Sequence, residues 1–326
     1  MCTRVVYSGS NGMVATGRSM DWKTDMHSNL WVFPRGMKRN GETGENSLEW
    51  TSRYGSVVTS AFEIASTDGM NEKGLVANLL WLPETEYPVR DKNKPGLAIT
   101  AWVQYMLDNF ATVEEAVAYI DEDTFQVVSD MMPDGSRLAT LHLSISDATG
   151  DCAIFEYIGG KLTVYHSKEY KVMTNSPTYN KQLALSEYWK SIGGLSFLPG
   201  TNRAADRFAR ASFYINALPE TDDDRIAVAS VFSVVRNASV PYGISTPESP
   251  EISTTQWRTV SESKNLRYFF ESSLTPNTFW VNLKDFDLSE GAPVFKLSIA
   301  NGEMYHGNTA KNFKTALPFK FMGVKG

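Results

Sequence analysis

The sequence has few cysteines and few histidines. Of its 326 residues only Cys2 and Cys152 are cysteines, and four are histidines. Two cysteines in a chain of this length exclude a disulfide framework, and Cys152 lies in an apolar run typical of a buried strand. The histidines lack the spacing of a metal-binding motif, so we expect neither a metal nor another cofactor.

The chain also lacks an excess of positive charge and a long hydrophobic run. The formal net charge of −6 argues against nucleic acid or an anionic membrane as a partner. It does not exclude a small anionic substrate, which needs only one or two local cations. No apolar stretch approaches the roughly 20 residues that span a bilayer. The first residues do not resemble a leader, so we expect a cytoplasmic protein, or a periplasmic one whose signal peptide has been removed.

Strand-like and helical segments alternate in blocks along residues 1–326. The order is strands, helices, strands, helices and strands, without repeats or a linker. This pattern favours a single α+β layered domain over a doubly wound sheet, in which strands and helices alternate every unit.

Local signals place the elements. The Asn-Gly pair at 11–12 predicts a hairpin between segments 3–8 and 13–19. Thr112 and Glu115 form a capping box that opens a helix through about residue 120. We also predict helices at 97–109, 179–191, 204–217 and 227–237, and a turn at 68–74 that leads into a strand at 74–81.

Cys2 is a candidate nucleophile. Removal of Met1 gives Cys2 a free α-amino group, whose pKa is near ~7.7–8.0 and which is therefore partly neutral at physiological pH. The amine can accept the thiol proton, so one residue supplies both nucleophile and base. The alternative is that Cys2 is an ordinary second residue.

The motif GRSMDW at 17–22 lies at the end of the predicted hairpin. The hairpin brings Arg18 and Asp21 towards the chain start. A guanidinium near a thiol favours the thiolate, and a carboxylate can hold the amine in place. A surface ion pair at a turn is the alternative interpretation.

The start MCTR, followed by GRSMDW, resembles the choloylglycine hydrolase family. This family contains conjugated bile salt hydrolases and penicillin V acylases, which are N-terminal nucleophile (Ntn) hydrolases. Further ordered matches are DGMNEKGL at 68–75, MTNSP at 173–177, LPG at 198–200, DRF at 206–208, NASVP at 237–241 and TQWR at 255–258. The resemblance covers essentially the whole chain and is closer to the Gram-negative branch.

The resemblance implies a four-layer αββα sandwich and a catalytic set. Cys2 is the nucleophile and its α-amine the base. Arg18 and Asp21 support the thiolate and the amine. Asn175 donates its side-chain amide to the oxyanion, and Arg207 steadies the cluster. The resemblance also implies a homotetramer.

Three further residues are candidates for substrate binding, with core packing as the alternative for each. The aromatic side chains of Trp22 and Trp81 suit an apolar acyl group, and Met20 can line the same pocket. Trp81 replaces the asparagine that many Gram-positive bile salt hydrolases have in an Asn-aromatic-Pro stretch. Its backbone N–H can still serve the oxyanion, whereas its indole changes the pocket.

The predicted reaction is hydrolysis of a linear, non-peptide amide. The segment 62–67 resembles bile salt hydrolases of Bacteroides-like gut bacteria, which places conjugated bile salts first. The two tryptophans favour the alternative, penicillin V or an acyl homoserine lactone. A non-enzymatic alternative is a silent small-molecule-binding protein, which would result if Met1 were retained.

Overall fold

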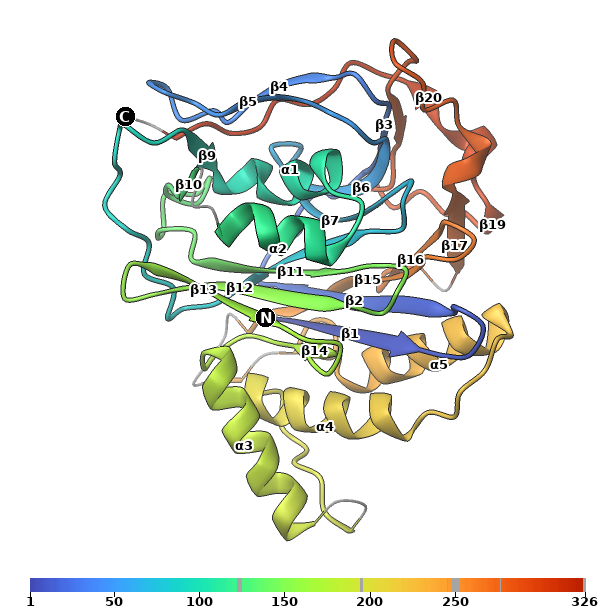
Figure 1. The fold of residues 1–326 in the computed structure, drawn as a ribbon. Helices are drawn as coiled ribbons and strands as arrows, with labels where there is room; N and C mark the ends of the chain where they lie inside the picture. Colours follow the sequence, from blue (N-terminus) through green and yellow to red (C-terminus); the bar gives the residue numbers. More distant parts are fainter. Residues whose placement is uncertain (122–124, 194–195, 245, 248–251, 276, 325–326) are drawn as a thin grey trace.

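The computed structural model describes residues 1–121, 125–193, 196–244, 246–247, 252–275 and 277–324. Two β-sheets pack face to face, and helices cover the outer face of each sheet (Figure 1). The four layers follow the order helix, sheet, sheet, helix. The predicted α+β class and αββα sandwich are confirmed.

The first sheet contains the N-terminal strand, which starts at Cys2. In the described part of the chain it has seven strands. In spatial order they are β14 (Val172–Met173), β1 (Cys2–Ser8), β2 (Val14–Trp22), β15 (Thr254–Glu262), β16 (Arg267–Ser272), β17 (Thr278–Asn282) and β19 (Gly307–Asn308). The turn between β1 and β2 has positive φ at Asn11 and Gly12, as a tight hairpin turn requires, so the predicted hairpin is confirmed.

The second sheet has nine strands within the described residues. In spatial order they are β13 (Lys161–His166), β12 (Cys152–Ile158), β11 (Leu141–Ser146), β8 (Val76–Trp81), β7 (Ala65–Asn71), β6 (Ser56–Ala61), β3 (Leu30–Phe33), β18 (Phe295–Leu297) and β20 (Lys314–Thr315). Adjacent residues of a strand point to opposite faces of the sheet and pack in different hydrophobic clusters. Val57 packs in the cluster between the sheets, whereas Val58 packs in the cluster beneath the helices.

Two helical layers close the sandwich. α1 (Trp102–Asn109) packs on β7 and β8, and α2 (Val113–Asp121) packs on β12. On the other side α4 (Ala204–Ala217) packs on β1, and α5 (Asp224–Asn237) packs on β2 and β15. α3 (Tyr179–Ile192) packs on α4 and projects from the sandwich at the bottom of Figure 1.

One half of the capping box predicted at the start of α2 forms. The backbone N–H of Glu115 donates to Thr112 Oγ1 over 3.1 Å, which satisfies one N–H that the first turn leaves unpaired. The Glu115 carboxylate accepts over 2.7 Å from the N–H of Ala111, one residue before the Thr112 N–H of a standard capping box.

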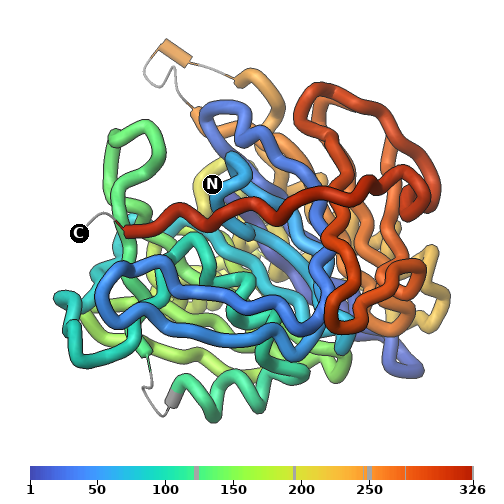
Figure 2. Tube along the Cα trace, turned by 90° about the horizontal axis from the view of Figure 1, so that it is seen from above, coloured from blue at the N-terminus to red at the C-terminus, as the bar shows by residue number. Residues whose placement is uncertain are grey.

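Short segments complete the fold. β9 (Gly96–Ala98) pairs with β10 (Gln126–Val128), and β4 (Lys38–Asn40) pairs with β5 (Glu49–Thr51). Residues 316–324, the C-terminal strap, cross the molecule as a red tube in Figure 2. The ring of Phe319 contacts Trp31 with centroids 5.3 Å apart, which ties the strap to the outer face of the second sheet.

Two sequence predictions were wrong locally. Residues 97 and 98 of the predicted helix 97–109 belong to β9, and η1 (Ile99–Ala101) precedes α1. The predicted turn at 68–74 is strand as far as Asn71. Asp68 pairs with Thr59 on one side and Asn78 on the other, so neighbouring strands override the Asp-Gly turn signal.

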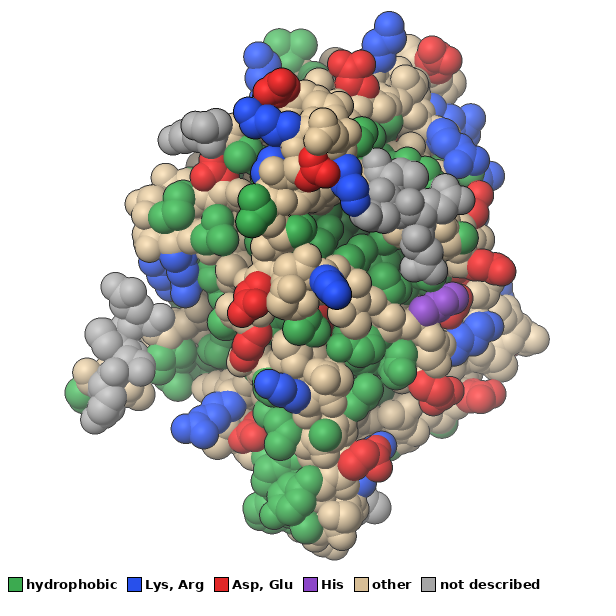
Figure 3. Space-filling model, turned by 60° about the vertical axis from the view of Figure 1, so that its left-hand side comes forward, with side chains coloured by type: hydrophobic (Ala, Val, Ile, Leu, Met, Phe, Trp, Pro, Cys, Tyr) green, Lys and Arg blue, Asp and Glu red, His purple; other side chains and the backbone are tan. Residues whose placement is uncertain are grey.

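α3 carries an exposed apolar surface. Tyr188 is 57% exposed, and Leu185 and Ile192 are also exposed. Hydrophobic side chains gather at the lower end of the face in Figure 3, over the region where α3 projects. The homotetramer stays a prediction. Among the described residues no helix combines the length and hydropathy needed to cross a membrane.

Gly17 tests the contact between β2 and α5. A Cβ atom at Gly17 would lie 2.5 Å from Val231 Cγ1 and 2.8 Å from Val235 Cγ2. We expect Gly17→Ala to lower the free energy of unfolding by about 1–3 kcal/mol, because the helix must shift to relieve overpacking. Urea denaturation measures this loss. Gly200→Ala is the control, because nothing lies within 4 Å of its Cβ position. Equal effects of the two substitutions would contradict the close approach of α5.

Candidate active site

Strand alternation places one set of site residues between the two sheets. Arg18, Met20 and Trp22 are alternate residues of β2 and therefore share a face. Cys2 is the direct antiparallel partner of Met20, so its thiol joins that face. Cys2 Sγ lies 3.8 Å from Met20 Sδ and 3.7 Å from Arg18 Nη2.

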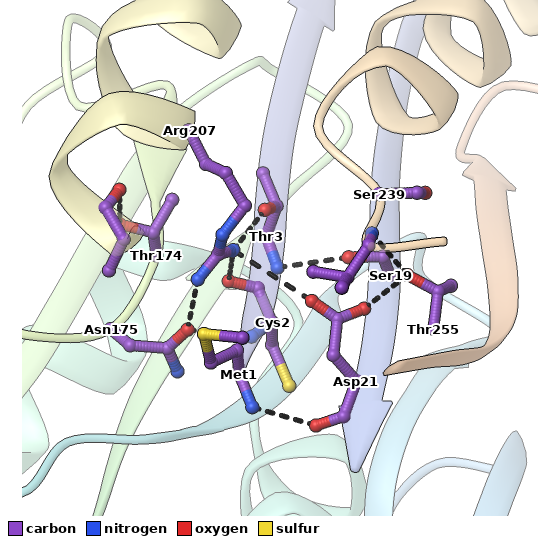
Figure 4. A network of polar contacts seen from close by, with 12 residues as sticks. Met1, Cys2, Thr3, Ser19, Asp21, Thr174, Asn175, Arg207, Ser239 and Thr255 are labelled. Atoms are coloured by element: carbon purple, nitrogen blue, oxygen red, sulfur yellow. Dashed lines mark hydrogen bonds and ion pairs between the residues drawn. The ribbon is translucent and has the colours of Figure 1, made fainter. Parts of the chain in front are cut away.

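The opposite face of the same strands turns towards α4. Arg207 of α4 donates through Nη1 to the Cys2 carbonyl and to Thr3 Oγ1, both over 2.6 Å (Figure 4). The same Nη1 lies 3.9 Å from Asp21 Oδ2. Burial lowers the pKa of Arg207, and the neighbouring Asp21 and Cys2 oppose that shift. The guanidinium therefore holds the start of β1 from the side of the sheet that α4 covers.

Asp21 is fully buried beside this cation. Its Oδ1 accepts a hydrogen bond of 2.6 Å from Thr255 Oγ1. Its Oδ2 accepts no hydrogen bond from the described residues. A buried carboxylate oxygen without a donor is unusual in a native structure and points to a partner that this arrangement lacks.

Asn175 connects the two sheets at the chain start. Its Oδ1 accepts from the Cys2 backbone N–H over 2.6 Å and from Arg207 Nη2 over 2.7 Å. Its Nδ2 donates to the Trp81 carbonyl over 2.6 Å. These three bonds fix which end of the amide faces Cys2, and they leave the second Nδ2 proton for another acceptor.

The Arg18 guanidinium makes hydrogen bonds, an ion pair and a cation–π contact. It donates to the carbonyls of Thr67 and Leu79 over 2.8 and 2.9 Å, and its guanidinium carbon lies 4.9 Å from the centroid of the Trp257 ring. Its Nη1 lies 3.5 Å from Asp68 Oδ2, and neither side chain is exposed. The cation next to the Cys2 thiol is thus fixed in place.

Asp68 is the site residue whose role sequence reasoning missed. It accepts from Asn78 Nδ2 over 2.6 Å and from the hydroxyl groups of Tyr268 and Thr259. Burial raises the pKa of Asp68, while the positive charge of Arg18 and then the hydroxyl of Tyr268 oppose the rise. The local pattern at 68–74 predicts a turn, which would place the carboxylate in solvent. Residues 65–71 show no alternation of apolar and polar side chains, so no local signal indicates the buried strand.

The residue before Cys2 occupies part of the site. The α-amine of Met1 donates to the Asp21 carbonyl over 2.7 Å, and the Asp21 N–H donates back to the Met1 carbonyl over 2.9 Å. Burial lowers the pKa of this α-amine from 8.0, and the charges of Cys2 and then Asp21 oppose the shift. While Met1 is present, the Cys2 nitrogen is a peptide nitrogen and has no basic lone pair.

An apolar cavity opens beside the thiol. Cys2, Met20, Trp22 and Trp81 all line it, and the centroids of the two indoles are 5.4 Å apart at an interplanar angle of 53°. Its other lining side chains are mostly hydrophobic, including those of Met26, Ala61, Phe62, Ile64, Ile99, Met131, Met132, Pro133 and Leu141. Hydrophobic side chains also surround a recess in the middle of the face shown in Figure 3.

The C-terminal strap forms part of the cavity wall. Met322, Gly323 and Val324 line the cavity together with Cys2. The strap is fixed there because Met322 N–H donates to the Ile64 carbonyl over 2.9 Å and Thr100 Oγ1 donates to the Met322 carbonyl over 2.8 Å. No local sequence pattern indicates that this segment reaches the site.

The structure brings together all eight residues that the sequence singled out. They are Cys2, Arg18, Met20, Asp21, Trp22, Trp81, Asn175 and Arg207. His142 lies outside the cluster as a structural residue, held between Glu156 Oε1 and the Thr174 carbonyl. Within the described ranges no group of three His, Cys, Asp or Glu residues is placed to share a metal ion.

This geometry agrees with the comparison with known proteins. The model for linear amide C–N hydrolases of the choloylglycine hydrolase family matches residues 2–296. The chain belongs to the choloylglycine hydrolase family. It is therefore an amidohydrolase that acts on linear amides.

Individual family members differ in their similarity to the chain. It is 50% identical to the penicillin V acylase of Pectobacterium atrosepticum, over 99% of this chain and 92% of the relative. It is 28% identical to a bile salt hydrolase/transferase of Clostridium perfringens, over 74% and 80% of the two chains. The solved structure of penicillin V acylase from Agrobacterium tumefaciens superposes with a TM-score of 0.93, at 56% identity, over 99% of this chain and 100% of that one.

Asp68→Asn tests whether the buried carboxylate balances the charge of Arg18. We expect the free energy of unfolding to fall by about 3–5 kcal/mol, because Arg18 would be left as an unpaired buried charge. Guanidinium denaturation measures the loss. Tyr268→Phe is the matched control, since it removes the hydrogen bonds of the hydroxyl with Asp68 and Thr59 but no charge, and should cost only about 1–3 kcal/mol. If Asp68→Asn costs no more than the control, the carboxyl group is protonated in the native protein.

Proposed function

We propose that the chain cleaves aryl- or alkyl-acylated amines of the penicillin V type, with Cys2 as an N-terminal nucleophile after Met1 is removed. The observation that carries the mechanism is the bond of 2.6 Å between the Cys2 nitrogen and Asn175 Oδ1. It positions the nitrogen beside a side-chain amide in a site where the thiol of the same residue faces an apolar cavity.

The freed α-amine of Cys2 serves as the base. Once Met1 is absent, the nitrogen is an α-amine, a group whose ordinary pKa of about 7.7–8.0 leaves part of it neutral near pH 7. It can therefore take the thiol proton. Asp21 Oδ2, which has no hydrogen-bond donor among the described residues, supplies an acceptor for the resulting ammonium. Arg18 stabilises negative charge on the sulfur 3.7 Å away.

Acylation and deacylation follow from these positions. The thiolate attacks the amide carbonyl carbon and forms a tetrahedral oxyanion. The α-ammonium then gives its proton to the departing amine, which leaves a thioester on Cys2. The neutral α-amine takes a proton from water, the water oxygen attacks the thioester, and the carboxylic acid departs as the thiol is restored.

Two donors are suited to the oxyanion. Asn175 Nδ2 has one proton that is not used by the Trp81 carbonyl. The N–H and C=O of one strand residue point to the same side, so the Trp81 N–H is directed towards the side on which Asn175 lies. Loss of one donor of this kind typically lowers the rate about 100- to 1,000-fold.

The acyl preference rests on the cavity and on the relatives. The segment 62–67 favours conjugated bile salts, but the relatives of 50% and 56% identity are both penicillin V acylases. The tilted indoles of Trp22 and Trp81 offer aromatic faces to a flat phenoxyacetyl group. Penicillin V is therefore better supported as the substrate than a conjugated bile salt, whose acyl group is a steroid.

Removal of Met1 is the first test of the mechanism. We expect the intact mass of the active protein to lack one methionine residue, because only then does Cys2 carry an α-amine. A chain with one alanine inserted between Met1 and Cys2 is the control and should not release amine from any substrate. Full activity in a protein whose mass shows Met1 in place would refute the N-terminal nucleophile mechanism.

Amine release measured side by side on four substrates tests the acyl preference. The substrates are penicillin V, glycocholate, taurocholate and an N-acyl homoserine lactone. We expect the highest kcat/KM for penicillin V, because its aromatic acyl group fits the apolar cavity beside Cys2. A higher kcat/KM for either bile salt would overturn the preference and leave the amidase mechanism intact.

A further inference from the structure

A small hairpin projects beside the cavity. Residues 129–139 form it, and it is visible as the green loop at the upper left of Figure 2. Met131 bridges to Leu138, the Met132 N–H donates to the Arg137 carbonyl over 2.8 Å, and the Ala139 N–H donates to the Asp130 carbonyl over 2.9 Å. These bonds fix the conformation of the hairpin, whose residues 130–133 line the cavity.

Arg137 on the other arm of this hairpin covers the indole pair. Its guanidinium carbon lies 4.2 Å from the centroid of the Trp81 ring and 5.7 Å from that of the Trp22 ring. The side chain is exposed to solvent. A cation–π contact uses the flat face of the guanidinium and leaves its in-plane N–H donors free to bind a carboxylate.

No carboxylate in the described part of the chain forms an ion pair with Arg137. The nearby Lys23, which follows Trp22 in sequence, is different, because its Nζ lies 3.5 Å from an Asp134 carboxylate oxygen. Arg137 is thus a cation without an ion-pair partner among the described residues, against the indoles of a mostly apolar cavity whose one charged lining residue is Asp130, in a protein whose formal net charge is −6. An anionic substrate gains more from such a local cation than from the protein as a whole.

We propose that Arg137 binds an anionic group on the amine half of the substrate, so that the enzyme selects amides whose leaving amine carries a carboxylate or sulfonate. The inference rests on the proposed function, in which the acyl half fills the cavity beside Cys2. The amine half then lies towards the opening, where the indoles hold Arg137. Penicillin V and amino-acid conjugates share this anionic group, whereas an acyl homoserine lactone lacks it.

A pair of substrates that differ only in this charge tests the proposal. Phenoxyacetylglycine carries the carboxylate, and phenoxyacetylglycinamide carries a neutral amide in its place. We expect Arg137→Gln to lower kcat/KM for the acid by about 10-fold, mainly through a higher KM, because a charge-assisted hydrogen bond to the bound substrate is lost. The kcat/KM for the glycinamide should stay close to that of the unsubstituted enzyme.

Two further variants separate charge from structure. Arg137→Lys keeps the charge but loses the planar pair of donors, so it should restore part of the affinity for the acid. Lys23→Gln is the matched control, because Lys23 is already paired with Asp134, and it should leave the acid-to-amide ratio of kcat/KM unchanged.

The outcomes distinguish this proposal from the proposed function. An equal loss on both substrates in Arg137→Gln, or no loss on either, overturns the role of Arg137. Hydrolysis of the neutral glycinamide by the unsubstituted enzyme reports on the amidase mechanism alone. If the unsubstituted enzyme cleaves neither substrate, both the acyl preference and the role of Arg137 are refuted.

Discussion

The register between β1 and β2 is the constraint on which the site depends. Cys2 pairs directly with Met20, which sends its thiol to the inter-sheet side of the first sheet. A slip of one residue would turn the thiol towards the helices and expose Thr3 to the cavity instead. The tight turn at Asn11 and Gly12 sets this register, and the pairing of β2 with β15 holds it from the other side. The second residue of the chain thereby becomes part of a buried sheet.

Buried charges then fix the two faces of that hairpin separately. Arg18 and Asp68 lie between the sheets, whereas Asp21 and Arg207 lie between the first sheet and α4. Desolvation makes such pairs expensive, so they contribute little to net stability. Their value here is positional, because each guanidinium contacts Cys2 from a different side through a fixed set of hydrogen bonds. The protein thus keeps costly buried charges because they orient a single residue, Cys2.

Local sequence signals predicted much of this structure. The turn at Asn11 and Gly12, the cap at Thr112 and the bounds of α4 all follow from nearby residues. Seven of the eight predicted site residues lie in ordered motifs, and Trp81 stands where the chain departs from the family pattern. Asp68, Arg137 and the C-terminal strap were not predicted, because their roles depend on partners far away in sequence. An Asp-Gly pair has the same local preference in a turn as in β7, and only the strands on either side decide between them.

The C-terminal strap has a consequence for synthesis in the cell. Cys2 leaves the ribosome early, whereas Met322 to Val324, which complete the cavity wall beside it, are translated after both sheets. The wall closes only when the strap docks against Ile64 and Thr100, so a ribosome-bound fragment has an incomplete cavity beside Cys2.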